Sequence, residues 1–246
     1  MPDDRALPPW LARHAGARGL GGLLDHTLLK PEATQAQIEE LCDEGRRFAV
    51  KAVCVNGAWT ELCADRLVGS GVIVAVVAGF PLGAMATATK AEEARLAVSG
   101  GAREVDMVVS LGAAKAGDWR AVEADVRRVV EAAGPALVKV ILETAALSPA
   151  EIVAACEAAV RGGAGFVKTS TGFHPAGGAA VEAVALMRRT VGPEIGVKAS
   201  GGVRSIEAAV AMLRAGADRI GTSSTAAMAA ALGPEAPPLK SLLAPS

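Results

Sequence analysis

Short apolar runs alternate along the chain with longer stretches that mix Ala, Leu, Arg and Glu. Each run has the length and the β-branched content of a buried strand, and each is followed by a stretch that can form a helix. The eight runs are Gly22–Thr27, Val50–Val55, Val72–Val77, Glu104–Val109, Leu137–Leu142, Gly165–Thr169, Ile195–Ala199 and Asp218–Gly221. Because eight βα units close a parallel barrel, the pattern predicts a single-domain α/β protein with the TIM (β/α)8 barrel fold.

Glycine-rich helix ends repeat along the chain and support this interpretation. Ser99–Ala102, Arg161–Ala164 and Arg214–Ala217 each end a helical stretch just before a strand, where glycine suits a left-handed cap. An open doubly wound sheet is the alternative, but no G-x-G-x-x-G fingerprint follows the first strand. Gly19–Gly22 precedes that strand instead and is interpreted as a turn.

Two helix starts are marked by capping residues. The stretch Thr34–Phe48 begins with a threonine cap, and Ser148–Glu151 combines a serine cap, a first-turn proline and a capping-box acid. We expect residues 1–22 to form an N-terminal extension, residues 23–232 the catalytic barrel, and the proline-rich residues 233–246 a tail without a domain of its own.

Composition excludes several classes of function. The 246 residues are 51% hydrophobic and carry a net charge of -1, without the basic stripe of a nucleic-acid-binding protein. No apolar run approaches the ~20 residues of a membrane helix, and the N-terminal stretch lacks the apolar segment of a secretion signal. We therefore expect a cytoplasmic protein with neither nucleic acid nor membrane as a partner.

The cysteines do not indicate a metal site. None of the four has C-x-x-C spacing, and only three histidines could join them as ligands. Free thiols within apolar segments most often act as small core side chains in a reducing compartment. We predict no metal and no organic cofactor.

Lysines occupy unusual positions in this sequence. The chain has only eight of them, yet Lys139, Lys168 and Lys198 lie inside apolar strands, one βα unit apart. Adjacent barrel strands are ~4.8 Å apart and inward positions alternate with outward ones. Equivalent positions on the sixth and seventh strands therefore bring Lys168 and Lys198 together.

Two neighbouring ammonium groups would make one of the amines reactive. At about 4 Å and an effective dielectric near 20 they repel by roughly 4 kcal/mol, or about three pKa units. A lysine whose pKa approaches 7–8 is partly neutral and can attack a carbonyl. Alternatively, each strand lysine reaches solvent at the barrel rim or pairs with Glu104, Asp106 or Glu143. Three buried cations in succession favour a function, because burial without one is costly.

Asp106 interrupts an apolar strand and needs a partner there. One interpretation is a structural ion pair with Lys139. The other is a proton shuttle beside the reactive amine, working through a water, since imine chemistry requires proton transfer. Both can hold together.

Small-residue loops follow the last three strands. They are Ser170–Gly172, Ser200–Arg204 and Gly221–Ser224, the last of which leads into a short helix, Thr225–Leu232. In barrels, the loops after strands seven and eight, with a helix N-terminus, form a recurrent phosphate site. We expect a phosphorylated substrate, with Arg204 adding positive charge.

Seven motifs together strongly resemble those of the deoxyribose-phosphate aldolase family, from about Leu23 to Leu232. They are Leu24–Leu29, Val53–Asn56, Gly79–Gly83, Glu104–Val108, Lys139–Thr144, Phe166–Gly172 and Val197–Arg204. The resemblance implies a class I aldolase, a lyase that reversibly cleaves 2-deoxy-D-ribose 5-phosphate to acetaldehyde and D-glyceraldehyde 3-phosphate. Its partners would be these small molecules and, as a family-level expectation, further copies of the chain in a homodimer or a higher homo-oligomer.

The resemblance also implies roles for individual residues. Lys168 stands at the position of the Schiff-base lysine, Lys198 at that of the lysine that lowers its pKa, and Asp106 at that of the proton-relaying acid. Substrate-binding positions are matched by Asp25, Thr27, Cys54, Lys139 and Thr171. Phosphate-binding positions are matched by Gly172, Gly201, Gly202, Arg204, Gly221, Ser223 and Ser224.

The chain departs from the family pattern at two places. Some members use a C-terminal tyrosine in proton transfer, and this chain contains no tyrosine. Some place a lysine that contacts phosphate where Phe173 stands. Two rival functions stay open: an imine-forming barrel aldolase that acts on a phosphorylated ketose, and a sugar-phosphate sensor, which would have little reason to retain Lys168, Lys198 and Asp106 together.

Overall fold

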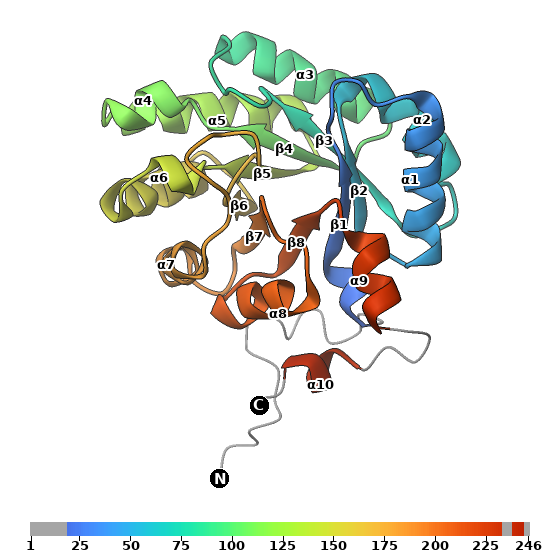
Figure 1. Cartoon of the computed structure of the whole chain (residues 1–246). Coiled ribbons are helices and arrows are strands. Elements are labelled where there is room, and N and C mark those ends of the chain that lie inside the picture. Colours follow the sequence, from blue (N-terminus) through green and yellow to red (C-terminus); the bar gives the residue numbers. More distant parts are fainter. Residues whose placement is uncertain (1–18, 233–237, 244–246) are drawn as a thin grey trace.

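Eight parallel strands form a closed barrel in the computed structural model, which describes residues 19–232 and 238–243 (Figure 1). The strands are β1 Leu24–Leu28, β2 Ala52–Val55, β3 Ile73–Ala78, β4 Glu104–Val108, β5 Leu137–Ile141, β6 Phe166–Lys168, β7 Gly196–Ser200 and β8 Arg219–Thr222. Each pairs with the next along the chain, and β8 closes on β1. The predicted TIM barrel is confirmed, with strand ends that differ from the expected ones by at most two residues.

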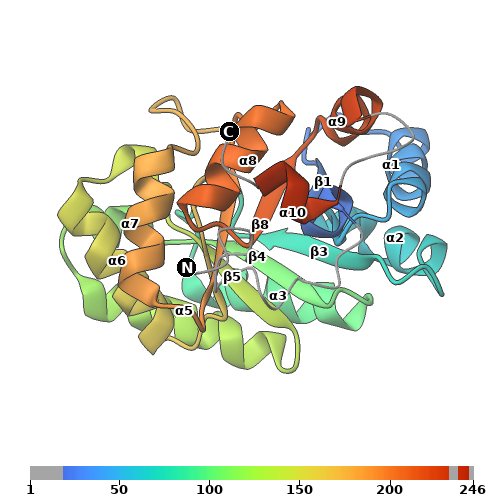
Figure 2. The same cartoon turned by 90° about the horizontal axis from the view of Figure 1, so that it is seen from below.

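Helices surround the barrel in both views (Figures 1 and 2). The α-helices are α1 Gln35–Arg47, α2 Thr60–Arg66, α3 Thr87–Ser99, α4 Leu111–Lys115, α5 Trp119–Ala133, α6 Pro149–Arg161, α7 Val181–Val191, α8 Ile206–Ala215, α9 Thr225–Leu232 and α10 Leu239–Leu243. Short 3-10 helices are η2 Leu20–Leu23, η3 Gly57–Trp59 and η4 Thr144–Ala146.

Both predicted helix starts are formed by capping boxes. The Thr34 hydroxyl accepts the N–H of Gln37, whose side chain in turn accepts the N–H of Thr34. Ser148 and Glu151 make the same reciprocal pair at the start of α6. Each box satisfies backbone donors that the first turn of a helix leaves free, so these helices begin where the sequence indicates.

Side-chain alternation along the strands separates the core from the site. In β4, Val105 and Met107 belong to the hydrophobic core that includes Val122 and Val126 of α5. The alternate residues, Glu104 and Asp106, point into the barrel, where they meet side chains of other strands. The apolar layer under the helices therefore holds the strands rigidly while their inward positions are free to carry charge.

Two segments differ from the sequence interpretation. Residues 20–23, expected to be part of a turn and of the first strand, form η2, and the strand begins only at Leu24. Part of the stretch expected to be a tail folds as α10, which lies beside α8 with Leu239 buried (Figure 1). Residues 1–18 lie outside the described residues, so the three-part division of the chain stays a prediction. No helix in the described ranges is long and apolar enough to span a membrane.

Candidate active site

The three strand lysines meet one carboxylate inside the barrel. Lys139 Nζ lies 2.6 Å from Oδ1 of Asp106, and the Nζ atoms of Lys168 and Lys198 lie 2.8 and 2.7 Å from Oδ2. Lys168 and Lys198 are direct partners across β6 and β7, which confirms the inference that they are neighbours. All four side chains are buried.

Three further charged side chains extend this group. Arg219, at the start of β8, donates from Nε to Asp25 of β1 over 2.8 Å and from two nitrogens to Glu104 of β4 over 3.1 and 3.2 Å. Asp25 also lies 2.5 Å from Lys198, and Glu104 lies 2.6 Å from Lys139. We call the seven residues the ion cluster: Asp25, Glu104, Asp106, Lys139, Lys168, Lys198 and Arg219.

Arg219 is the member of the ion cluster that was not predicted from the sequence. Its only signal is an arginine within the apolar run before Ile220 and Gly221, where a side chain that points inward must find acids. Glu104 was named only as one possible partner of a strand lysine, and it does pair with Lys139. Glu143, named with it, contacts no lysine among the described residues and instead accepts hydrogen bonds from Thr171.

The ion cluster contains four cationic side chains but three carboxylates. A buried, unbalanced charge is costly, so the group that loses its proton most readily will be neutral for much of the time. Two observations identify it as Lys168. Lys168 contacts only one carboxylate oxygen of the cluster, Oδ2 of Asp106, and it shares that oxygen with Lys198. It also lines the cavity at the mouth of the barrel.

The pKa values of the two neighbouring lysines move in opposite directions. Burial lowers the pKa of Lys168; the Asp106 carboxylate opposes this, and the Lys198 ammonium lowers it further. Burial would also lower the pKa of Lys198, but the carboxylates of Asp106 and Asp25 outweigh burial and raise it. The pKa of Lys168 is therefore lowered, as predicted. The prediction attributed the lowering to Lys198 alone, whereas burial is the larger cause.

Asp106 is held as a carboxylate. Burial alone would raise its pKa, but the ammonium groups of Lys139, Lys168 and Lys198 bring the pKa well below its ordinary value. The same attraction, from Asp106 and Glu104, raises the pKa of Lys139 against the effect of burial. Asp106 is thus paired with Lys139 and also lies beside Lys168 as a possible proton acceptor. This geometry is compatible with both roles considered for it, the structural ion pair and the proton shuttle.

A cavity of about 210 Å³ opens above the ion cluster at the ends of β1, β6, β7 and β8. Its wall holds Lys168, Thr27 of β1 and most of the residues predicted in the loops after the last three strands: Thr171, Gly172, Gly201, Gly202, Arg204, Gly221 and Ser223. Asp25, Cys54, Asp106, Lys139 and Lys198 are fully buried and lie outside this wall, as does Ser224. The cavity thus places the predicted phosphate loops next to Lys168, the amine of the ion cluster that lines it.

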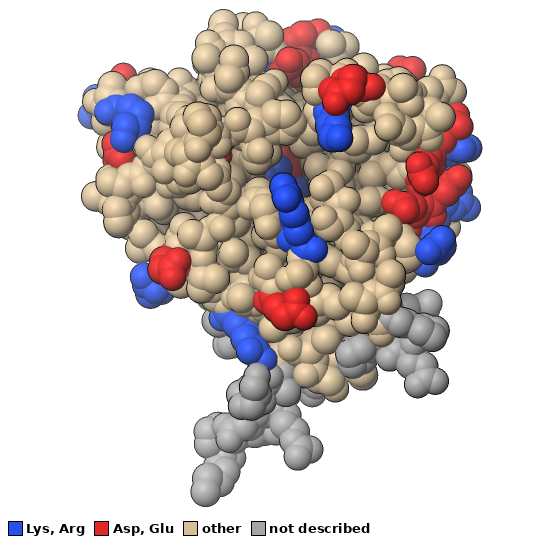
Figure 3. All heavy atoms as spheres, viewed as in Figure 1, with Lys and Arg blue, Asp and Glu red and all other residues tan. Residues whose placement is uncertain are grey.

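Positive charge dominates the wall of this cavity. Lys30, which was not among the predicted site residues, follows β1 and lines the cavity with Arg204. Neither side chain makes a hydrogen bond or ion pair with any residue that the structure describes, and no carboxylate is part of the described wall. Basic side chains cross the middle of the face drawn in Figure 3. Such a mouth favours an anionic ligand.

Backbone contacts fix the loops around the cavity. Gly201 has φ 91°, a left-handed conformation that favours glycine. Its carbonyl accepts the N–H of Ala179 over 2.9 Å, and a Cβ on Gly178 would lie only 2.2 Å from that same oxygen. The loop after β7 is therefore held against the loop after β6 by a close approach that only a glycine at 178 permits.

Two predicted positions behave as small or apolar groups. Cys54 is buried beside the ion cluster, and burial raises the pKa of its thiol, which keeps it protonated. Phe173, half exposed at the mouth, packs edge-on against Phe80, with the ring centres 5.2 Å apart. The position where some relatives place a lysine is therefore an apolar wall here.

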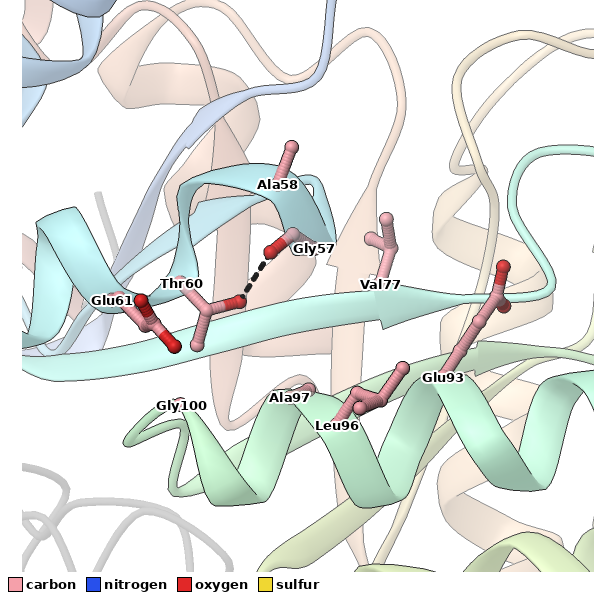
Figure 4. Close-up of a pocket in the computed structure, with 9 residues that line it drawn as sticks. All are labelled: Gly57, Ala58, Thr60, Glu61, Val77, Glu93, Leu96, Ala97 and Gly100. Carbon is pink, nitrogen blue, oxygen red and sulfur yellow. Dashed lines mark hydrogen bonds between the residues drawn. The ribbon is translucent and has the colours of Figure 1, made fainter.

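A second cavity, of about 360 Å³, lies outside the barrel between η3, α2 and α3 (Figure 4). Its charged lining residues are Glu61 and Glu93, and Glu93 accepts the N–H of Gly79 over 2.6 Å. Acids at its wall make it unsuited to a phosphorylated sugar. Within the described ranges, no group of three or more His, Cys, Asp or Glu side chains is placed to hold a metal ion.

Comparison with known proteins gives a consistent result. The family description "DeoC/LacD family aldolase" matches residues 23–230. Deoxyribose-phosphate aldolases of Brevibacillus brevis and a Geobacillus species are 57% and 56% identical over 201 and 203 residues, which cover 82% of this chain and 90% and 91% of theirs.

Solved structures agree with these sequence matches. An aldolase called QR15 superposes with a TM-score of 0.83 at 39% identity, covering 87% of this chain and 96% of its own. The deoxyribose phosphate aldolase of Aeropyrum pernix, described as a unique tetramer, gives 0.80 at 33% identity with 92% of each chain covered.

Proposed function

The chain belongs to the DeoC/LacD family of aldolases, and from this premise we propose that it acts through an imine formed on Lys168. It is a lyase with deoxyribose-phosphate aldolase activity. The reaction is the reversible cleavage of 2-deoxy-D-ribose 5-phosphate to acetaldehyde and D-glyceraldehyde 3-phosphate. One observation carries the proposed mechanism: Lys168 is the cluster cation without a carboxylate of its own, and it faces the cavity.

The chemistry follows from a neutral amine at that position. Lys168 Nζ adds to the C1 aldehyde of the open-chain sugar, and loss of water gives a protonated imine. The C3 hydroxyl then loses its proton, and the C2–C3 bond breaks. Its electron pair moves towards the imine, which leaves an enamine on the enzyme and releases the three-carbon aldehyde. Protonation at C2 and hydrolysis free acetaldehyde and restore the amine.

Proton transfer in this scheme depends on Asp106 and its neighbours. Its Oδ2 lies 2.8 Å from Lys168 Nζ, close enough to accept and return protons directly or through one water. Lys198, whose ammonium contacts the same oxygen, keeps that carboxylate charged. We assign Lys139, Asp25 and Cys54 to the buried layer beneath the pocket, where they surround Lys198 and Asp106, and Thr27 and Thr171 to contacts with the sugar hydroxyls.

The phosphate group fits the basic mouth of the barrel. Gly172, Gly201 and Gly202 lie in the loops after β6 and β7, Gly221 lies in β8, and Ser223 and Ser224 follow β8 directly before α9. Backbone N–H groups there and the helix N-terminus favour an anion. We assign Arg204, on the β7 side, and Lys30, on the β1 side, as the two cations that flank it.

A homo-oligomer is the proposed assembly. The related Aeropyrum pernix enzyme is described as tetrameric, and this chain exposes large apolar side chains on its surface, including Val68 at 75% and Leu96 at 55%. Light scattering coupled to size-exclusion chromatography tests this. A monomer at micromolar concentration would contradict it.

Reductive trapping tests the proposed mechanism. Incubation with acetaldehyde and borohydride should place one ethyl group on Lys168, identified by peptide mass mapping, and abolish activity. Lys115→Gln, which removes an exposed lysine of α4 from a surface ion pair with Glu151, should be trapped at the wild-type rate. Ethylation of another lysine would refute the assignment. Turnover with a phosphorylated ketose but not with acetaldehyde would favour the rival aldolase.

A further inference from the structure

We propose that Arg219 leaves Lys168 without a carboxylate of its own by occupying Asp25 and Glu104, and so acts as a positioning residue for the imine-forming amine. The inference rests on the proposed function, because it concerns the charge of the amine that forms the imine. Arg219 does not line the cavity, and its side chain is 2% exposed.

The geometry ties Arg219 to two acids at once. Its nitrogens reach Asp25 over 2.8 Å from Nε and Glu104 over 3.1 and 3.2 Å. A planar guanidinium suits this bridge, because it presents several donors in fixed directions to two carboxylates. Arg219 also stands directly beside Lys198 across β7 and β8, so its charge adds to those of the lysines.

Charge counting shows what Arg219 changes. Without it, the ion cluster would hold three lysines and three carboxylates. Glu104 would then balance Lys139 at 2.6 Å, Asp25 would balance Lys198 at 2.5 Å, and Asp106 would be left for Lys168 at 2.8 Å. With Arg219 present, Asp25 and Glu104 are shared with a fourth cation, and Asp106 must serve all three lysines.

The charged and titratable groups around Lys168 come from several strands of the barrel. Asp106 of β4, Lys198 of β7 and Cys54 of β2 act on its pKa directly. Asp25 of β1, Lys139 of β5 and Arg219 of β8 act on the groups that contact it, and Glu104 of β4 acts on Lys139 and Arg219. Since the Cys54 thiol is kept protonated by burial, the balance among them is set by the carboxylates and the cations.

The test measures how the rate of trapping by acetaldehyde and cyanoborohydride depends on pH. In Arg219→Met, Lys168 keeps Asp106 to itself and stays protonated, so the rising limb of the profile should move to higher pH. Loss of one buried charge near an amine corresponds to a fall of about 10- to 100-fold in trapping rate at pH 7. The rate should recover at alkaline pH. Arg219→Lys, which keeps the charge, should retain a near-wild-type profile.

A compensating change separates charge from packing. Adding Glu104→Gln to Arg219→Met leaves three cations and two carboxylates, and should return the profile towards neutral pH. Glu104→Gln alone should move the profile to lower pH than wild type. That single variant keeps the test decisive if Arg219→Met does not fold, because a purely structural role of Glu104 and Arg219 predicts no displacement of the profile.

The outcomes distinguish the inference from the proposed function. Trapping of wild type on a residue other than Lys168 would overturn the proposed function. Trapping on Lys168 with profiles that coincide for wild type, Arg219→Met and Glu104→Gln would leave the proposed function intact and overturn the role of Arg219.

Discussion

At the scale of single residues, the reactivity of each lysine in the barrel depends on how many carboxylates contact it. The Nζ atoms of Lys168 and Lys198 lie 2.8 and 2.7 Å from the same Asp106 oxygen, yet their pKa values move in opposite directions. The difference comes from Asp25, which lies 2.5 Å from Lys198 and gives that lysine a second carboxylate. One amine is thereby kept charged and the other is left able to react.

Replacing Lys198 should protonate its neighbour. In Lys198→Met, Asp106 serves only Lys168 and Lys139, so the pKa of Lys168 rises and trapping at pH 7 should slow by roughly 100-fold. The pH profile of trapping measures this directly. Lys90→Met is the matched control: Lys90 is equally buried and lies 2.7 Å from Asp125, outside the ion cluster. It should lower stability without moving the profile, and a displacement in both variants would contradict the argument.

Replacing Asp106 should separate imine formation from turnover. Asp106→Asn removes a carboxylate that keeps Lys168 protonated, so trapping should persist, while loss of the proton acceptor should lower kcat by about 100-fold or more. The melting temperature should also fall, because Lys139 and Lys198 lose a buried partner. Turnover close to that of wild type would limit Asp106 to a structural role.

Lys30 should matter only for the phosphorylated substrate. A charge-assisted hydrogen bond to phosphate contributes roughly 1.5–3 kcal/mol, so Lys30→Gln should raise KM for deoxyribose 5-phosphate by about 10- to 100-fold. Cleavage of unphosphorylated deoxyribose should change less than about twofold. Lys30→Arg should restore most of the affinity. Equal effects on both substrates would show that Lys30 does not contact the phosphate.

Sequence reasoning found the residues with a local signal and missed those without one. Lys139, Lys168 and Lys198 stand out because each interrupts an apolar strand. Lys30 lies in an ordinary polar turn, and only the closure of β1 on β8 brings it to the cavity. Arg219 required knowledge of which acids face it across the barrel, which no spacing along the chain provides.

At the scale of elements, regular alternation made strands easier to predict than the loops between them. Strand pairing placed Lys168 opposite Lys198 as expected. The loop after β6 instead depends on a contact between backbones that are distant in sequence. Ala179 donates to the carbonyl of Gly201 over 2.9 Å, and the absence of a side chain at Gly178 makes room for that contact.

Gly178→Ala should therefore displace the loop after β7. The added Cβ would lie 2.2 Å from the Gly201 oxygen, so the backbone must shift, at a cost of about 1–3 kcal/mol for such overpacking. We expect a higher KM for the phosphorylated sugar and a lower melting temperature. Gly112→Ala is the control, because its Cβ would meet no atom within 4 Å in α4. Unchanged kinetics in Gly178→Ala would show that the loop tolerates the shift.

At the scale of the whole molecule, the ion cluster links β1, β4, β5, β6, β7 and β8. The arrangement makes one chemical site out of strands that are distributed over nearly the full barrel. The helices, which carry the apolar layer, contribute none of the seven residues.

Acid should destabilise this arrangement. Arg219 and the lysines lower the pKa values of Asp25, Glu104 and Asp106 against the effect of burial. The stability that these carboxylates provide is thus complete above their ordinary values near 4 and is lost as pH falls below them towards the folded values. The melting temperature should fall steeply below pH 4. Asp106→Asn should fall less steeply there; an acid limb identical to that of wild type would exclude Asp106 as a contributor.

The bond between Arg219 and Asp25 joins the last strand to the first. The side chain that joins the two ends of the barrel is also the fourth buried cation of the site, so closure of the barrel and the excess of positive charge beside Lys168 depend on the same residue.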